Sequence, residues 1–186
     1  MTKPLIRTAQ VKDFVSIQSI YAIEVREHTA TFEITPPDIE EMTLRWRHIT
    51  DMGLPYLVAE LDGDVVGYAY ASSYRSRPAY SHTVEDSVYV AREKHRQGLG
   101  RSLLTELIHR CRDLGKRQMI AIIGDSRHNA SIRLHENAGF RHVGTLEQVG
   151  WKLDQWIDSV IMQRSLDLGP NDEVFNRNEP ADGIDR

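Results

Sequence analysis

The chain has 186 residues, of which 40% are hydrophobic and 27% are charged, enough for one well-formed core and too few for two comfortable domains. A formal net charge of −4 argues against a nucleic-acid-binding protein and against one drawn to an anionic membrane surface. With one cysteine, no signal-peptide pattern and no apolar run of membrane-spanning length, we expect a cytoplasmic protein without disulfides.

The first part of the chain contains both strand and helix patterns. Asp13 can cap a first helix, and Pro37 stands at the start of a second. The apolar residues predicted to face inward on the first helix are Val15, Ile17, Ile20, Tyr21 and Val25. In chain order we predict a strand at residues 5–9, a helix after Asp13, a loop at 28–37, a helix at 38–49, and strands at 56–60 and 65–74.

A strand, a basic glycine-rich turn and a helix follow over residues 85–114. The run from Val88 to Val90 favours a buried strand. From Gly98 onward, apolar residues recur at steps of three and four, which predicts one buried helix face. Cys111 falls on that face, so we expect a small core residue and not a nucleophile or metal ligand.

The turn before this helix suits an anion. The N–H groups of a first helical turn lack internal partners, and the helix dipole places partial positive charge there. Gly98 and Gly100 would let a phosphate approach these groups, and Arg96 and Arg101 add full charges. A turn that only redirects the chain fits the spacing equally well, and the Rossmann pattern is incomplete because Leu103 stands at its third glycine position.

The last third predicts one more helix and three strands. Gly139 is placed to end the helix as its C-cap. The predicted elements are a strand at residues 119–123, a polar loop at 124–129, a helix at 131–138, and strands at 142–146 and 156–162 joined by a polar turn region at 150–155.

Two motifs in this order resemble those of the GNAT acetyltransferase superfamily. Val88-Tyr89-Val90 followed by Arg96-Gln97-Gly98-Leu99-Gly100 resembles its acetyl-CoA motif, Gln/Arg-x-x-Gly-x-Gly/Ala, with His95 where Gln or Arg is usual. Residues 129–140 resemble its second motif, Asn-x-x-Ser/Ala-x-x-Leu-Tyr-x-x-x-Gly-Phe, with His135 in the place of Tyr.

Residues 5–166 are similar, within this superfamily, to the phosphinothricin and methionine sulfoximine N-acetyltransferases. Lys152, Trp156 and Asp158 match a further Gly-x-Lys…Trp-x-Asp pattern of that branch, and we expect Trp156 to pack in a core or an interface. The resemblance implies an α/β (α+β) fold of GNAT type, with a mixed, mainly antiparallel, twisted sheet that is splayed at its centre and flanked by helices. We expect this domain at residues 1–166 and a polar C-terminal tail at 167–186.

The same resemblance implies that acetyl-CoA lies in the splay, with its pantetheine chain paired to a strand edge. The usual Asn position of the second motif falls on His128, and either His128 or Asn129 could reach the pantetheine. We prefer Asn129 because its amide both donates and accepts. The residues expected to bind acetyl-CoA are Val88, Tyr89, Val90, Arg96, Gln97, Gly98, Leu99, Gly100, Arg101, Asn129 and Ser131.

Two residues are candidates for proton transfer. Glu85 aligns with the acidic residue that takes the amine proton in the resembled enzymes, whereas Asp86 should face the other way on the strand. His135, or a water, would protonate the CoA thiolate. Taken from the residues alone, a purely structural hydrogen-bonding role explains Glu85 and His135 as well as a role in proton transfer does.

The acceptor would be held by a short stretch after the strand at 65–74. Arg75, Ser76 and Arg77 place two arginines two positions apart, which suits a bidentate grip on a carboxylate or phosphinate. Solvated surface charge is the alternative. Phe32 would form an apolar wall of the acceptor pocket, or plug the core under its loop, or both.

The predicted function is direct transfer of the acetyl group of acetyl-CoA to the amine of a small amino acid such as methionine sulfone, methionine sulfoximine or phosphinothricin. No covalent acyl-enzyme and no metal is expected, because no nucleophile triad or metal-ligand spacing is found. The alternatives are acetylation of a protein N-terminus or lysine, and a non-catalytic acyl-CoA-binding sensor. The resemblance also implies a homodimer.

Overall fold

The computed structural model describes residues 4–166, within which seven strands form one twisted sheet in the order β1-β2-β3-β4-β5-β7-β6. The parallel pair in this sheet is β4 with β5, and the other neighbours run antiparallel, which confirms the predicted mixed, mainly antiparallel sheet. The strands are β1 (Leu5–Thr8), β2 (Tyr56–Leu61), β3 (Asp64–Ser73), β4 (Thr83–Val90), β5 (Gln118–Gly124), β6 (Arg141–Lys152) and β7 (Gln155–Ser165).

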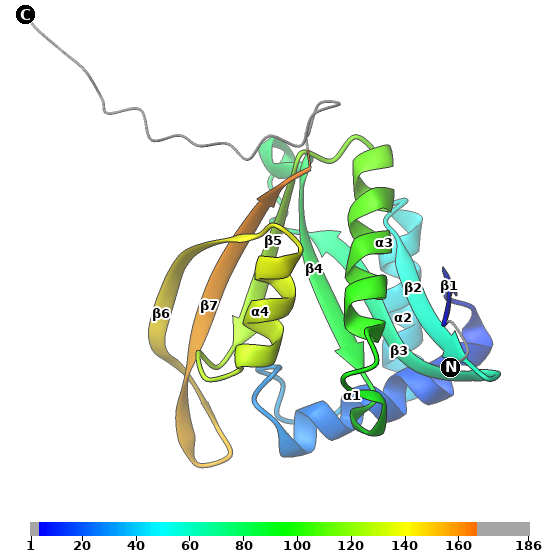
Figure 1. Cartoon of the computed structure of the whole chain (residues 1–186), viewed down its shortest axis with the longest axis horizontal. Helices are drawn as coiled ribbons and strands as arrows, with labels where there is room; N and C mark the ends of the chain where they lie inside the picture. The colour runs from blue at the N-terminus through cyan, green and yellow to red at the C-terminus, as the bar shows by residue number, and fades with distance from the viewer. Residues whose placement is uncertain (1–3, 167–186) are drawn as a thin grey trace, which may run out of the picture.

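Helices cover both faces of the sheet (Figure 1). On one face, α3 packs across β2, β3 and β4, and α4 lies beside it over β5. On the other face, α1 contacts β3 and α2 contacts β2. The helices are α1 (Phe14–Glu27), α2 (Ile39–Asp51), α3 (Leu99–Asp113) and α4 (Asn129–Asn137), with short 3-10 turns η1 (Val11–Asp13), η2 (Pro78–Tyr80) and η3 (Arg92–Lys94).

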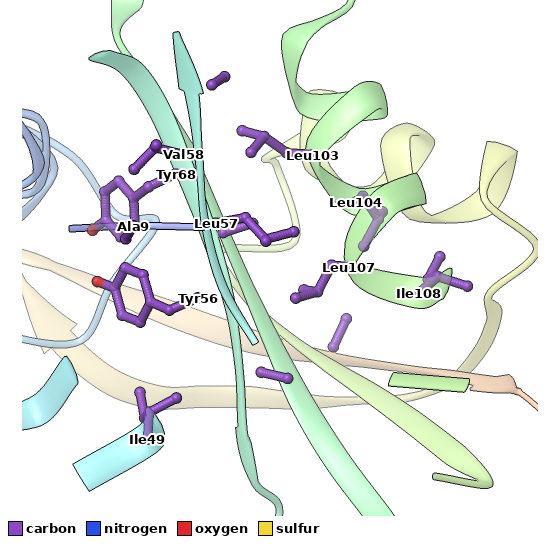
Figure 2. Packing of buried hydrophobic residues seen from close by; sticks show 14 of the residues in the cluster. Ala9, Ile49, Tyr56, Leu57, Val58, Tyr68, Leu103, Leu104, Leu107 and Ile108 are labelled. Carbon is purple, nitrogen blue, oxygen red and sulfur yellow. The ribbon is translucent and has the colours of Figure 1, made fainter. Parts of the chain in front are cut away.

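The core therefore lies in two layers, one on each side of the strands. Figure 2 shows Leu103, Leu104 and Leu107 of α3 on one side of the sheet, and Tyr56 and Tyr68 on the other. Alternation along the strands produces this division, because successive side chains point to opposite faces. Burial of these side chains fixes which strand residues face α3 and which face α1 and α2.

The sheet opens at its centre. β4 pairs with β5 only from Thr83 to Asp86, where Asp86 stands opposite Ala121. Beyond that point β4 continues to Val90 beside β3, while β5 continues beside β7. The two strands diverge visibly in Figure 1. Residues Ser87–Val90 therefore border the gap without a partner strand on that side, as the predicted splay requires.

The first helix differs from its prediction at two residues. The prediction for Val15 was wrong, because this side chain is 61% exposed while Phe14 beside it is fully buried. The helix begins at Phe14, directly after a 3-10 turn, and Phe14 takes the buried position at its start, whereas the other predicted positions are buried as expected: Ile17, Ile20, Tyr21 and Val25. Asp13 occupies the N-cap position but does not cap with its side chain, because its carboxylate accepts hydrogen bonds from Arg7 and from the backbone N–H of Gln10.

The C-terminal hairpin is longer than predicted. The expected turn region at 150–155 shrinks to Leu153 and Asp154, which both have left-handed backbone, with φ of 52° and 55°. Cross-strand pairing continues to Lys152 and Gln155 and forms a long two-stranded ribbon. The predicted tail at residues 167–186 lies outside the described residues. None of the helices in residues 4–166 combines the length and apolar character needed to cross a bilayer.

Candidate active site

The N-terminus of α3 forms an anion cradle, by which we mean the turn and first helical residues from Arg96 to Arg101. Gly98 is the N-cap, with φ of 78°, a left-handed conformation that favours glycine, and no side chain caps the helix. The first bond of the helical ladder runs from the N–H of Ser102 to the carbonyl of Gly98, so the preceding N–H groups lack helical partners. Arg96 is also left-handed, with φ of 62°. The exposed turn therefore offers backbone donors and two guanidinium groups to an anion.

Close packing joins this cradle to α4. A Cβ added at Gly100 would lie 3.3 Å from a methyl carbon of Leu134, so a small residue lets the first turn of α3 approach α4. His95, the departure from the usual motif, has Nε2 2.9 Å from the carbonyl oxygen of Val90. This bond holds the cradle against the end of β4. A phosphate-bearing ligand seated in the cradle would therefore start beside the free edge of β4.

The free edge of β4 and the start of α4 flank the same gap. Val88 and Val90 pair with β3 on one side, and their other side faces the splay. Asn129 is the exposed first residue of α4, and His128 before it is half-buried. Burial lowers the pKa of His128, although the charges of Glu24 and Asp125 oppose this shift. The site thus fits acetyl-CoA in two respects, an anion cradle for the pyrophosphate and an unpaired strand edge for the pantetheine amides.

His135 lies inside the protein, on the buried side of α4. Its Nδ1 is 2.8 Å from the carbonyl oxygen of Ser131, and its Nε2 is 3.0 Å from Oδ2 of Asp86. Both side chains are almost fully buried, at 4% and 5% exposure. Burial lowers the pKa of His135, but the charge and hydrogen bond of Asp86 outweigh it, so the pKa is raised. Sequence alternation placed Asp86 opposite to Glu85, but nothing local indicated that Asp86 would meet His135.

Glu85 points to the other face of the sheet. It pairs across β3 with Ser72, and cross-strand partners share a face. Burial is the main cause that raises the pKa of the Glu85 carboxyl; the neighbouring charge of Asp86 adds to the rise, and Arg75 opposes it. A half-buried carboxylate with a raised pKa is suited to accept a proton near neutral pH.

A cavity of about 680 Å³ lies on the same face as Glu85, between α2 and the sheet. Ser72, Arg75, Ser76 and Arg77 line it at the end of β3. Neither Arg75 nor Arg77 forms an ion pair among the described residues, although Arg75 lies 5.0 Å from the ring of Tyr74. The opposite wall of the cavity is formed by residues of α1, α2 and the sheet that sequence reasoning did not select: Tyr21, Met42, Arg45, His48, Ile49, Tyr56 and Tyr70.

Phe32 stands apart from this cavity. Its ring packs against β6, where a Cβ added at Gly150 would lie 2.5 Å from the ring, and it remains 41% exposed. Thr31 next to it belongs to a buried network: its hydroxyl lies 2.9 Å from that of Tyr21, and its carbonyl accepts from Lys152 at 2.7 Å. The loop at 28–37 therefore reaches the cavity wall through Tyr21. The spacing of Tyr68 and Tyr70 on β3 was a signal for an aromatic wall on this face.

Comparison with known proteins identifies close relatives. Residues 6–161 match the model of the acetyltransferase (GNAT) domain family. The chain is 51% identical over 164 residues to phosphinothricin N-acetyltransferase of Alcaligenes faecalis, covering 88% of this chain and 83% of that protein. It is 38% identical over 162 residues to L-methionine sulfoximine/L-methionine sulfone acetyltransferase of Salmonella typhimurium, covering 87% and 94% of the two chains.

Solved structures share the fold. A GNAT superfamily phosphinothricin acetyltransferase from Sinorhizobium meliloti, crystallised in complex with AcCoA, superposes with a TM-score of 0.86 at 42% identity, over 95% of this chain and 98% of that one. Ribosomal-protein-alanine N-acetyltransferase from Brucella melitensis superposes with a TM-score of 0.84 at 38% identity, over 87% and 99%.

Proposed function

The chain belongs to the GNAT acetyltransferase family, and from this premise we propose how its residues divide the work of amino-acid N-acetylation. It is an acetyl-CoA-dependent N-acetyltransferase that acts on the amine of small amino acids of the phosphinothricin and methionine sulfoximine type. The observation that carries the assignment of the acceptor site is the cavity on the Glu85 face, which brings two unpaired guanidinium groups to the same side of the sheet as a half-buried carboxylate.

Acetyl-CoA supplies the acetyl thioester, and the chain supplies three binding elements for it. The anion cradle takes the pyrophosphate through backbone N–H groups, with Arg96 and Arg101 adding charge. The free edge of β4 pairs with the pantetheine amides through backbone groups, and the start of α4 closes over them. The proposed contacts are Val88, Tyr89, Val90, Arg96, Gln97, Gly98, Leu99, Gly100, Arg101, Asn129 and Ser131.

The acceptor enters the cavity between α2 and the sheet. Arg75 and Arg77 bind its carboxylate, with Ser76 between them on the same wall. Glu85 accepts a proton from the ammonium group, directly or through a water, so that the free amine can attack. The raised pKa of Glu85 suits this role, since a stronger base takes the proton more readily. Phe32, which stands apart from this cavity, packs on Gly150 of β6, and no contact with the acceptor is proposed for it.

The leaving sulfur needs a proton, for which His135 or a water is the source. His135 lies on the face of the sheet covered by α3 and α4, and Glu85 lies on the opposite face. Glu85 can therefore take a proton from the amine while His135 gives a different proton to the sulfur. No covalent intermediate on the protein is proposed, because Cys111 is buried and burial raises the pKa of its thiol to about 12.

We propose a homodimer that buries the hairpin patch, defined as Val149, Trp151 and Trp156. These side chains are 52–57% exposed, and the two Trp rings lie 5.1 Å apart as cross-strand partners. Contiguous exposed aromatic side chains are typical of protein interfaces. We also propose a cytoplasmic location, in keeping with the one free cysteine of the sequence.

A thiol-release panel tests the function. Purified protein and acetyl-CoA are mixed with free amino acids, including methionine sulfone, methionine sulfoximine and phosphinothricin, and with peptides bearing free N-termini or lysines. We expect CoA release with the free amino acids. Release with peptides alone would favour a protein acetyltransferase, and binding of acetyl-CoA by calorimetry without release would favour a sensor.

A further inference from the structure

The Asp86–His135 pair occupies the vertex of the splay. Asp86 is the last residue of β4 that pairs with β5, and its side chain points to the face covered by α3 and α4. A pantetheine chain that begins at the anion cradle beside Val90 and follows the free edge of β4 ends where the strands rejoin, at Asp86. The thioester sulfur of acetyl-CoA would therefore be delivered next to this pair.

The hydrogen bonds of His135 fix its protons. A carbonyl oxygen can only accept, so Nδ1, 2.8 Å from the carbonyl of Ser131, carries a hydrogen. Nε2 then faces a carboxylate oxygen at 3.0 Å, and one further proton must lie between these two atoms. The ring beside an ionised Asp86 is thus an imidazolium, with a hydrogen on each nitrogen.

Few other charges bear on the pair. Asp86 Oδ1 is buried without a hydrogen-bond partner among the described residues, so the carboxylate keeps a free acceptor at the vertex. From α3, Cys111 faces the pair as a neutral thiol, its pKa raised chiefly by burial and also by Asp86. The edge of the His135 ring is packed on Phe140 at 5.0 Å, Ala121 of β5 is apolar, and Glu85 of β4 lies on the opposite face.

We infer that Asp86 is a positioning residue for the transfer: it holds His135 as a doubly protonated imidazolium at the vertex of the splay, where the CoA sulfur leaves. This inference rests on the proposed function. The amine nitrogen bonds to the acetyl carbon and loses one N–H proton to water as the amide forms. The C–S bond breaks, and the sulfur receives the Nε2 proton as that proton changes its acceptor from Asp86 Oδ2 to sulfur. Neutral His135 remains, with its Nδ1 hydrogen still donated to Ser131, and solvent returns the proton after CoA departs.

The test measures the ring and the reaction separately. The His135 imidazole is titrated by long-range ¹H–¹⁵N NMR without substrates, in the wild type and in Asp86→Asn, Asp86→Glu and the exposed control Asp113→Asn, with His135→Gln to assign the signal. We expect the ring in the wild type to stay doubly protonated above pH 6.5, in keeping with its raised pKa. The midpoint should fall by about 1–3 pH units in Asp86→Asn, recover in part in Asp86→Glu and stay in place in Asp113→Asn.

The kcat–pH profile supplies the second readout. Because the acid form of His135 gives the proton, kcat should fall as pH rises through its pKa, and this descending limb should move to lower pH in Asp86→Asn by the same amount as the NMR midpoint. A neutral His135 ring in the wild type at neutral pH, or an unmoved descending limb, would overturn the inference. If Asp86→Asn does not fold, the NMR titration of His135 in the wild type and in Asp86→Glu, together with their kcat–pH profiles, still tests the inference. Failure of the proposed function would appear separately, as no CoA release from the wild type with any acceptor.

Discussion

The Nζ of Lys152 donates a hydrogen bond to the carbonyl oxygen of Thr31 at 2.7 Å, joining residues 121 positions apart in the sequence. The ammonium also lies 3.3 Å from the carbonyl oxygen of Glu24, near the end of α1. Lys152 is only 4% exposed, and burial lowers its pKa. The end of β6 therefore holds the loop at 28–37, whose Thr31 hydroxyl contacts Tyr21 on the cavity wall.

Lys152→Met should loosen this loop. The substitution keeps most of the aliphatic chain but leaves two buried carbonyls without their donor, a loss of about 1–3 kcal/mol in the free energy of unfolding. We expect a higher KM for the amino acid and an unchanged Kd for acetyl-CoA, measured by steady-state kinetics and calorimetry. Lys12→Met, at an exposed lysine, is the matched control. An equal loss of acetyl-CoA binding would show that the loop does not act on the acceptor side alone.

Gly98→Ala should weaken acetyl-CoA binding. A Cβ at Gly98 would meet nothing within 4 Å, so the cost comes from the left-handed backbone, about 1–2 kcal/mol, and from the altered direction of the first N–H groups of α3. Gly115→Ala at the other end of α3 is the control, since φ there is 72° and the space is equally open. Both variants should lose similar thermal stability, and only Gly98→Ala should raise the Kd for acetyl-CoA. Equal Kd values in the two variants would argue against the anion cradle.

Glu85→Gln should separate activity from stability. Loss of the base should lower kcat about 100-fold or more and remove the ascending limb of the kcat–pH profile. The folded-state pKa of Glu85 is raised, so the folded protein loses stability as pH rises from the unfolded-state pKa through the folded one. Glutamine does not ionise, and Glu85→Gln should therefore melt at a higher temperature than the wild type at neutral pH. Full activity in Glu85→Gln, with Glu40→Gln on α2 as the control, would remove Glu85 from the mechanism.

Arg77→Gln should impair acceptor binding. A charge-assisted bond to a carboxylate contributes about 1.5–3 kcal/mol, which corresponds to a rise of about 10- to 100-fold in the KM of the amino acid. The KM of acetyl-CoA should not change, because the cradle lies elsewhere. Arg47→Gln, an exposed arginine of α2 outside the cavity lining, should leave both constants unaltered. The same test applies to Arg75→Gln. Unchanged acceptor KM values in both variants would exclude binding of the acceptor carboxylate by these two arginines.

Trp156→Glu should disrupt the proposed dimer. Its side chain is 57% exposed and packs on Trp151, so a charge there places an unpaired carboxylate in the proposed interface. Light scattering after size-exclusion chromatography should give twice the chain mass for the wild type and one chain mass for the variant. Leu5→Glu, on a residue 56% exposed at the opposite edge of the sheet, should leave the mass unchanged. A monomeric wild type would exclude the homodimer.

Local sequence pattern was enough to predict most of the helices and strands and much of the proposed acetyl-CoA site. The step of three and four residues after Gly98 predicts α3, and a turn rich in glycine and arginine before a helix predicts an anion cradle, since both depend on residues close together in sequence. The resemblance to GNAT enzymes extended this to the sheet and its splay. The exposure of Val15 could not be obtained this way, because the neighbouring Phe14 fills the buried position at the start of α1.

The sequence by itself determined which elements form and which residue types could carry acetyl transfer. Only the tertiary structure decided that Asp86 meets His135, 49 residues away, and that Lys152 holds Thr31. It also separated Phe32 from the cavity and brought α2 to its wall. The physical reason is that periodicity specifies which face of an element is buried, whereas the partner on that face is set by how strands and helices far apart in sequence pack together.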